Sequence, residues 1–338
     1  MKVLIEVHHP AHIHFWKYPI RELQARGHQV RMIARDRDVM RRLAEAYDWL
    51  DVVTPKRYMQ ANSFPLIEML HRQWVVAREI YRFKPDVVAS LMGSYTQSAK
   101  LFGVRNVIFT DSEFQHFNHK IAHPFADEIY TPECFYKDLG HKQRRYSAIH
   151  EWSFLSPKYF EAQASVLSKY PSLVAEQYVV IRLSAWNTFH DRGESGIGEQ
   201  IYKFVERFKE RYTLVLSAEE RRLPPGLEHL ELQVAPEDYH QVLSQAAFVL
   251  SEGASTASEA VCVGVPTVYI NSTETRGYLL YLAEVSPLLK NFQGAAEGML
   301  VAEEYLAHLS ETPHPCNGAV PFELDLVEYV VDALEGTR

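Results

Sequence analysis

Cysteine is scarce in this sequence, and the three that occur are far apart. Cys134, Cys262 and Cys316 are odd in number and form no CxxC pair within the 338 residues. This pattern excludes a disulfide framework of the kind that stabilises small secreted domains. We therefore expect the protein to reside in a reducing compartment.

Long apolar runs and an excess of basic charge are also missing. No window of about 18 residues is free of polar side chains, and the N-terminus carries no apolar stretch of signal-peptide length. The formal net charge of −8 argues against a nucleic-acid-binding protein held mainly by phosphate contacts. These absences predict a cytoplasmic protein with no membrane span and no nucleic-acid partner.

Short apolar strands alternate with longer amphipathic helices along most of the chain. The alternation begins with KVLIEV at 2–7, lapses across 156–176 and resumes with YVVIRLS at 178–184. Such alternation predicts parallel sheets with right-handed crossovers, and hence an α/β fold of two doubly wound halves. The expected division is a first domain over 1–160, a linker over 161–176, a second domain over 177–322 and a C-terminal helix over 323–338.

Six small residues in a row, Gly253 to Ser258, separate two apolar strands of the second half. Small side chains leave the N–H groups at the start of the following helix open, and the helix dipole adds partial positive charge there. The stretch therefore predicts an anion site. Thr256 and Glu259 also have the T-x-x-E spacing of a capping box, so a capped turn without a ligand is the alternative interpretation.

The stretch SEGASTASEAVCVGVPTVY resembles the donor-site signature of GT-B glycosyltransferases, most of all the GlcNAc transferase of peptidoglycan synthesis. Nearly the whole chain resembles a family catalogued as a domain of unknown function, placed near the GT-B transferases and the non-hydrolysing UDP-GlcNAc 2-epimerases. HPAHIHFWKYPIRELQARGHQV, FTDSEF, PFADEIYTPECF and IRLSAWNTFHDRG carry this resemblance. It implies a GT-B architecture, with two Rossmann-like domains facing across a cleft.

The resemblance also implies roles for the small-residue loop. Ser255 and Thr256, beside Gly253 and Ala254, would hold the diphosphate of a nucleotide sugar, which we expect to be UDP-linked. Glu259 would accept hydrogen bonds from the ribose hydroxyls, a role that competes with the capping box. Because the helix start supplies positive charge, we expect neither a metal ion nor a cofactor.

Four histidines cluster after the first strand, in EVHHPAHIHFW. Histidine is the side chain best suited to proton transfer near neutral pH. His12 matches the histidine that opens the first helix in the GT-B enzymes, so we expect it to take the proton of an acceptor hydroxyl, with His9 and His14 on the acceptor side. Pro10 and Ala11 stand where those enzymes have glycines. A metal site is the alternative use of the cluster, although its spacing follows no zinc signature.

Polar loops follow other strands of both halves, where open α/β sheets bind their ligands. In the second half, the candidate contacts of the nucleotide sugar are Arg182, Ser184, Trp186, His190 and Asp191. Arg182 lies inside its strand, so an ion pair across the sheet is the alternative for it.

In the first half, the candidates on the acceptor side are Gly93, Ser94, Asp111, Glu113 and His116. Asp111 and Glu113 are two residues apart and point to the same side of an extended chain. Either carboxylate is a candidate catalytic acid or base, and Asp111 is equally a candidate helix cap.

Residues 64–84 combine an apolar stripe with several arginines. We expect this helix to pack on the sheet, and its alternative use is peripheral contact with an anionic membrane. The acceptor itself is a glycan, a lipid-linked molecule or a small molecule; the sequence does not choose among them.

The leading hypothesis is a metal-independent GT-B glycosyltransferase. A UDP-GlcNAc 2-epimerase-like enzyme is the alternative, against which HHPAH and GSYT replace the motifs of that family. A nucleotide-sugar-binding protein without activity is the third hypothesis.

Overall fold

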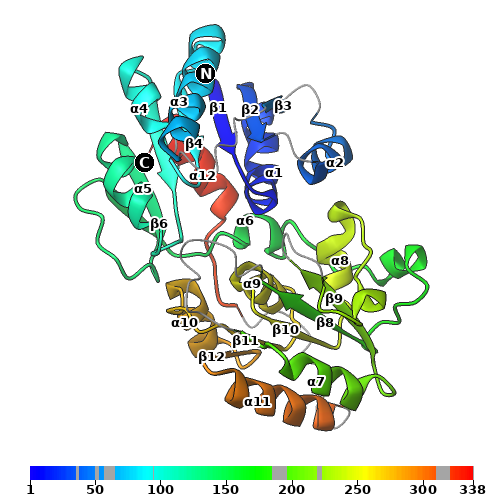
Figure 1. Ribbon diagram of the computed structural model, residues 1–338. Helices are drawn as coiled ribbons and strands as arrows, with labels where there is room; N and C mark the ends of the chain where they lie inside the picture. The colour runs from blue at the N-terminus through cyan, green and yellow to red at the C-terminus, as the bar shows by residue number, and fades with distance from the viewer. Residues whose placement is uncertain are drawn as a thin grey trace. The chain divides into compact units, whose positions relative to one another are not determined.

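The computed structural model describes residues 1–35, 38–49, 53–56, 65–93, 95–184, 196–218, 223–309 and 320–337. The chain divides into two compact units (Figure 1). The first unit is Met1–Phe154 with Phe322–Arg338, and the second is Leu155–Pro321. The last helix, expected as a separate element, therefore belongs to the first unit.

A seven-stranded sheet forms the centre of the first unit, in the order β3-β2-β1-β4-β5-β6-β7. All of its strand pairs are parallel. The strands are β1 (Lys2–Val7), β2 (Gln29–Arg35), β3 (Val53–Lys56), β4 (Val87–Ser90), β5 (Arg105–Phe109), β6 (Glu128–Pro132) and β7 (Gln143–Tyr146). The strand order reverses between β1 and β4, which makes the carboxyl ends of these two strands the switch point of a doubly wound sheet.

Helices connect these strands. They are α1 (Pro10–Ala25), α2 (Asp38–Ala46), α3 (Pro65–Phe83), α4 (Thr96–Leu101), α5 (His116–Ile121), the 3-10 helix η1 (His123–Phe125) and α6 (Trp152–Leu155). Helices cover both faces of the sheet, so strands such as β1 and β4 are buried and apolar on both sides, whereas the edge strand β7 is polar. Leu4, Ile33 and Val88 of the sheet pack with Val76 and Ile80 of α3 in one such core, which shows that the apolar stripe of α3 packs on the sheet as expected.

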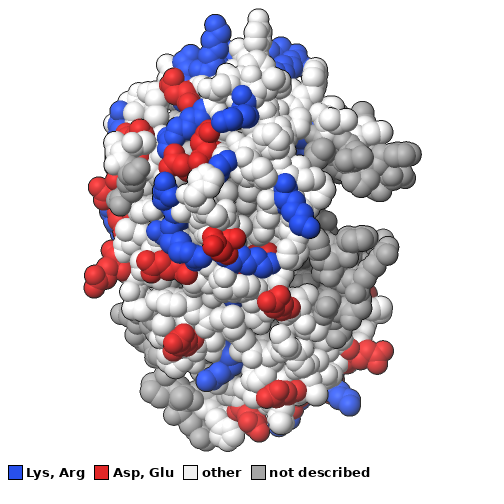
Figure 2. All heavy atoms as spheres, turned by 90° about the vertical axis from the view of Figure 1, so that its left-hand side faces the viewer, with Lys and Arg blue, Asp and Glu red and all other residues white. Residues whose placement is uncertain are grey.

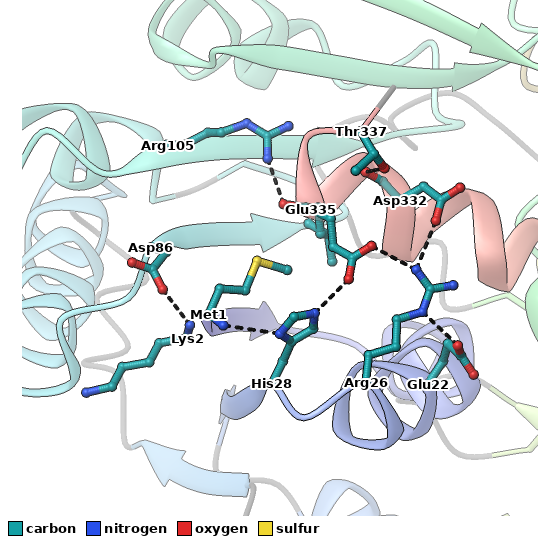
Figure 3. Close-up of polar contacts among 11 residues, drawn as sticks. Met1, Lys2, Glu22, Arg26, His28, Asp86, Arg105, Asp332, Glu335 and Thr337 are labelled. Carbon is teal, nitrogen blue, oxygen red and sulfur yellow. Dashed lines mark hydrogen bonds and ion pairs between the residues drawn. The ribbon is translucent and has the colours of Figure 1, made fainter.

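The C-terminal helix α12 (Leu326–Glu335) docks on the first unit through polar contacts at its carboxyl end (Figure 3). Nη1 of Arg26 lies 3.0 Å from Oδ1 of Asp332 and 2.8 Å from Oε2 of Glu335. Arg105 donates to the carbonyl oxygens of Ala333 and Leu334, both at 2.7 Å. Cations at a helix C-terminus satisfy its open carbonyl groups and its dipole.

The second unit has a five-stranded parallel sheet in the order β12-β11-β10-β8-β9. Its strands are β8 (Tyr178–Leu183), β9 (Thr213–Ala218), β10 (Phe248–Ser251), β11 (Thr267–Ile270) and β12 (Leu289–Phe292). Its helices are η2 (Ala164–Lys169), α7 (Gln200–Phe208), η4 (Glu228–Leu230), η5 (Pro236–Asp238), α8 (Tyr239–Leu243), α9 (Ala254–Cys262), α10 (Gly277–Val285) and α11 (Ala295–His308). The expected α/β fold of two parallel, doubly wound sheets is confirmed.

Two details of the second unit differ from the simple alternation of the sequence. Residues 161–176, expected as a linker, contribute Val166, Leu167 and Leu173 to a core cluster under this sheet. The stretch LELQV at 230–234, whose apolar residues alternate as in a strand, makes only an isolated bridge between Glu231 and Leu216.

Acidic and basic side chains are interspersed over the face of the molecule in Figure 2, so neither sign dominates that face. Ion pairs such as Lys100 with Asp127 and Arg105 with Glu128 bring oppositely charged side chains into contact. No helix within the described ranges combines the length and the hydropathy that a membrane span requires.

Candidate functional site

The small-residue loop of the second unit lies at the carboxyl end of β10, the central strand of its sheet. The helix α9 begins at Ala254 with Gly253 as its N-cap, and no side chain caps it. The capping-box interpretation is therefore wrong, because Thr256 lies inside the first turn instead of at the cap.

The first turn of α9 has features that favour the binding of an anion. The Ser255 side chain is exposed there, whereas Thr256 is buried. The first N–H groups of a helix have no partner within it, and they carry its partial positive charge. A Cβ atom on Gly253 would lie 3.3 Å from Cγ of Arg182, so glycine lets the turn approach the arginine closely.

Two residues of the neighbouring helix α8 contact α9. The hydroxyl of Tyr239 lies 3.3 Å from Oγ1 of Thr256. Nε2 of His240 lies 3.3 Å from Oε1 of Glu259, and both side chains are buried. Burial, and then the charge of Glu259, raise the pKa of Tyr239 to about 12, while nearby Arg182 opposes the shift. The tyrosine is therefore a neutral hydroxyl at physiological pH.

A buried carboxylate, Glu252, accepts hydrogen bonds from the backbone just after β8 and just before α7. Its Oε2 accepts the N–H of Ser184 and its Oε1 accepts the N–H of Ile197, both at 2.7 Å. Arg182 donates to Oγ of Ser217 on β9, at 2.6 Å. The partner of Arg182 on the neighbouring strand is therefore a hydroxyl group. The alternative interpretation expected an ion pair with a carboxylate there. Trp186, His190 and Asp191 lie outside the described residues.

The histidine loop of the first unit follows β1. His9 is the exposed N-cap of α1, and its Nδ1 accepts the N–H of Ala11 at 3.2 Å. His8 is buried, with Nε2 at 3.1 Å from Oε1 of the fully buried Glu6. Nδ1 of His12 accepts the N–H of His8 at 3.4 Å, which is long for a hydrogen bond. A neutral His12 in this arrangement carries its proton on Nε2.

His12 in the first turn of α1, Asp111 after β5 and His150 after β7 come together in the first unit. Oδ2 of Asp111 lies 3.1 Å from Nδ1 of His150, which is 7% exposed. Burial lowers the pKa of His12 well below its usual range; His9 and His8 lower it further, and the charge of Asp111 opposes them. His12 is thus neutral at pH 7, beside a carboxylate that would stabilise its protonated form.

Glu113, expected as an alternative proton acceptor, is instead fully buried. Its backbone oxygen accepts a hydrogen bond from Nζ of Lys137 at 2.6 Å. Burial, followed by the charges of Glu113, Asp111 and Glu151, raises the pKa of the Cys134 thiol to about 12. These acidic side chains form a cluster around Cys134 in which Asp111, a quarter exposed, is the group that reaches solvent, because Glu113 and Glu151 are buried.

The other acceptor-side candidates are separated by the structure. His14 is buried, with its Nδ1 at 3.2 Å from the hydroxyl of Tyr47. His116 is exposed and lies 3.5 Å from Nζ of Lys137. Gly93 has φ +76°, and a Cβ there would lie 2.5 Å from Cδ1 of Ile108, so it packs in the turn after β4. Ser94 lies outside the described residues.

His119 of α5, which is half-buried, and the buried His123 of η1 lie with their ring centroids 4.7 Å apart. Burial lowers the pKa of His119 to about 4 and that of His123 to about 3. Within the described ranges, no three His, Cys, Asp or Glu side chains are grouped so that they could hold a metal ion. The metal interpretation of the histidine clusters therefore gains no support from these residues.

Sequence reasoning missed His150, Glu252, Tyr239 and His240. His150 follows β7, whose sequence QRRY gives little sign of a strand. Glu252 directly follows an apolar strand, and that position was the signal that could have identified it. Tyr239 and His240 have no such signal, because their partners lie on another helix.

Comparison with known proteins places the chain among GT-B folds. The UDP-GlcNAc 2-epimerase of Methanocaldococcus jannaschii, in complex with UDP-GlcNAc and UDP, is 14% identical; the match covers 99% of this chain and 100% of that one with a TM-score of 0.73. The Neisseria meningitidis epimerase bound to UDP-GlcNAc is 13% identical over 99% and 100% of the two chains, with a TM-score of 0.72.

Acinetobacter baumannii MurG is 16% identical over 99% of both chains, with a TM-score of 0.57. Identities this low establish the fold alone, and the expected GT-B fold with two Rossmann-like domains is confirmed. A search of curated proteins found no match. The family described as "Protein of unknown function (DUF354)" matches residues 1–293.

Proposed function

This chain belongs to the DUF354 family, and we propose that it is an enzyme that acts on a nucleotide sugar. The observation that carries the proposal is the first turn of α9, where open N–H groups, the exposed Ser255 and a close arginine meet at the end of a central strand. Such a turn suits a diphosphate. The epimerases and MurG, whose fold the chain shares, make a nucleotide sugar the natural first ligand to test.

The second unit would hold the donor. Ser255 and Thr256 bind the diphosphate, Glu259 binds the ribose hydroxyls, and Arg182 lies beside the turn as a cation. The positive end of α9 stabilises the charge that develops on the leaving diphosphate. The proposal therefore assigns no catalytic step to a metal ion or cofactor.

The reaction we propose is glycosyl transfer to a hydroxyl acceptor. The acceptor oxygen forms a bond to the anomeric carbon as the bond from that carbon to the diphosphate breaks, and the electron pair leaves with the diphosphate. His12 takes the proton of the hydroxyl, because its imidazole is neutral at pH 7. Asp111 stabilises the imidazolium that results.

The proposed role of His12 as a base requires a particular tautomer of its imidazole. Its Nε2 can accept a proton only when the ring proton lies on Nδ1, so the contact with the His8 N–H must be given up. That contact is 3.4 Å long and therefore weak.

Epimerisation of a nucleotide sugar is the second candidate. It is favoured by the cluster of several proton-transfer groups in the first unit, His12, Asp111 and His150, since inversion at carbon needs a proton removed and a proton returned. Transfer needs only one such group.

Product analysis separates the two reactions. The protein is incubated with UDP-linked sugars, with and without candidate glycan or lipid-linked acceptors, and the nucleotides are resolved by chromatography and phosphorus NMR. Acceptor-dependent release of UDP supports transfer. An isomeric UDP-sugar formed without net release of UDP supports epimerisation. Absence of both products, from a protein that binds the nucleotide, would leave the binding protein as the correct hypothesis.

A further inference from the structure

Helix α8 supports the proposed nucleotide site with two consecutive residues. Tyr239 contacts Thr256, which would hold the diphosphate, and His240 contacts Glu259, which would hold the ribose; both separations are 3.3 Å. Thr256 and Glu259 are three residues apart, so they lie on the same face of α9. Each part of the nucleotide site thus has its own supporting side chain on α8.

The contact between His240 and Glu259 restricts a flexible carboxylate. Both side chains are at least nine-tenths buried, and one carboxylate oxygen, Oε1, faces Nε2 of His240. A glutamate that is buried against a neighbouring ring loses much rotamer freedom, and an acceptor ordered in advance binds its ligand without that cost at the moment of binding. Tyr239 restrains the Thr256 hydroxyl in the same manner.

We infer that His240 positions Glu259 for the two ribose hydroxyls, and that Tyr239 independently positions Thr256 for the diphosphate. This inference rests on the proposed function. It makes His240 the determinant of selectivity for ribonucleotides over dideoxyribonucleotides. Both are positioning residues, since each acts through its partner on α9.

The test compares UDP with 2′,3′-dideoxy-UDP by calorimetric titration. The wild-type protein is expected to bind UDP about tenfold more tightly than 2′,3′-dideoxy-UDP. Only UDP has the ribose hydroxyls that would donate hydrogen bonds to the charged carboxylate of Glu259. His240→Phe should bring that ratio close to one by weakening UDP alone. His240→Gln, which keeps a donor near the position of Nε2, should retain most of the ratio.

Tyr239→Phe is the matched control on the adjacent residue. It should weaken both ligands by the same factor and leave their ratio unchanged. Glu259→Gln gives a second measure should His240→Phe fail to fold, and it should also lower the ratio. Thermal unfolding of each variant shows whether the fold is kept.

Three results would overturn the inference. A folded His240→Phe variant that keeps the full preference for UDP would show that His240 does not act on the ribose. The same conclusion would follow if the variant lost affinity for UDP and for 2′,3′-dideoxy-UDP by the same factor. A wild-type protein that binds both ligands equally would contradict the ribose role of Glu259. A wild-type protein that binds neither would overturn the proposed function itself, which is a distinct outcome.

Discussion

Nδ1 of His150 lies 3.1 Å from Oδ2 of Asp111, although the two residues follow different strands of the first sheet. The aromatic ring of Phe15, with its centroid 4.8 Å from that of His150, packs against the imidazole. The pair orients the one carboxylate of the acidic cluster that reaches solvent. This arrangement suits a side chain that supports proton transfer at His12.

Replacing His150 by Phe should lower kcat about 10- to 100-fold, by analogy with residues that orient metal-binding side chains. Phenylalanine keeps an aromatic ring at this position and removes the hydrogen bond to Asp111, so nucleotide affinity should stay as in the wild type. Steady-state kinetics with calorimetry separate the two effects. His141→Phe, an exposed histidine of the same unit, is the control. A variant with full kcat would show that the pair plays no part in turnover.

The role of His12 can be separated from simple hydrogen-bond donation. As a general base it contributes about 10²- to 10⁴-fold to the rate, and neither amide can replace it. We therefore expect His12→Asn and His12→Gln to lose activity alike, with UDP binding retained. If His12→Gln kept most of the activity, the proton on Nε2 would be acting as a donor and the proposed base role would be wrong.

Acid should destabilise the first unit through His123. Burial lowers its pKa from 6.5 to about 3, so below pH 6.5 the unfolded chain binds a proton that the folded chain does not. The associated stability is complete above pH 6.5 and falls with decreasing pH, by at most about 1.4 kcal/mol per pH unit for one histidine. His123→Phe should flatten this dependence between pH 6.5 and 4.

Urea unfolding at several pH values measures the effect, and His141→Gln is the control because that side chain is exposed. An unchanged pH dependence in His123→Phe would contradict the buried, neutral state of His123. His119, with a pKa of about 4, is expected to contribute in the same direction.

The docking of α12 should depend on Arg26, which faces Asp332 and Glu335. Arg26→Met keeps the aliphatic stem but removes the ion pairs with Asp332 and Glu335, and the free energy of unfolding should fall by about 1 kcal/mol. Because the side chains are partly exposed, added salt should reduce the difference between variant and wild type. Lys209→Met, which removes an exposed pair with Glu206, should matter less. Equal losses in the two variants would contradict a special role for Arg26.

Much of the fold could be predicted because parallel strands buried on both faces are apolar throughout. Tyr178–Leu183 and Phe248–Ser251 show this plainly. Gln143–Tyr146 does not, because it is a polar strand at the edge of its sheet, and so the loop that carries His150 went unrecognised.

The candidate site was predictable only where the signal is local. The small residues before α9 and the histidines after β1 each mark a turn at a strand end. The partners of Asp111 and Glu259 are set by packing between separate elements, which no spacing in the sequence encodes. Glu113 shows that a local signal can also mislead. It was expected to be a catalytic acid or base because it follows a strand, and it is fully buried.

The central claim is that the first turn of α9 binds a nucleoside diphosphate. Calorimetric titration of the purified protein with UDP, GDP, TDP and CDP, without added metal, tests it most directly. We predict micromolar affinity for one of them, expected to be UDP, and loss of that binding in the Ser255→Ala/Thr256→Ala double variant. No binding to any of the four, or undiminished binding in the folded double variant, would contradict the account.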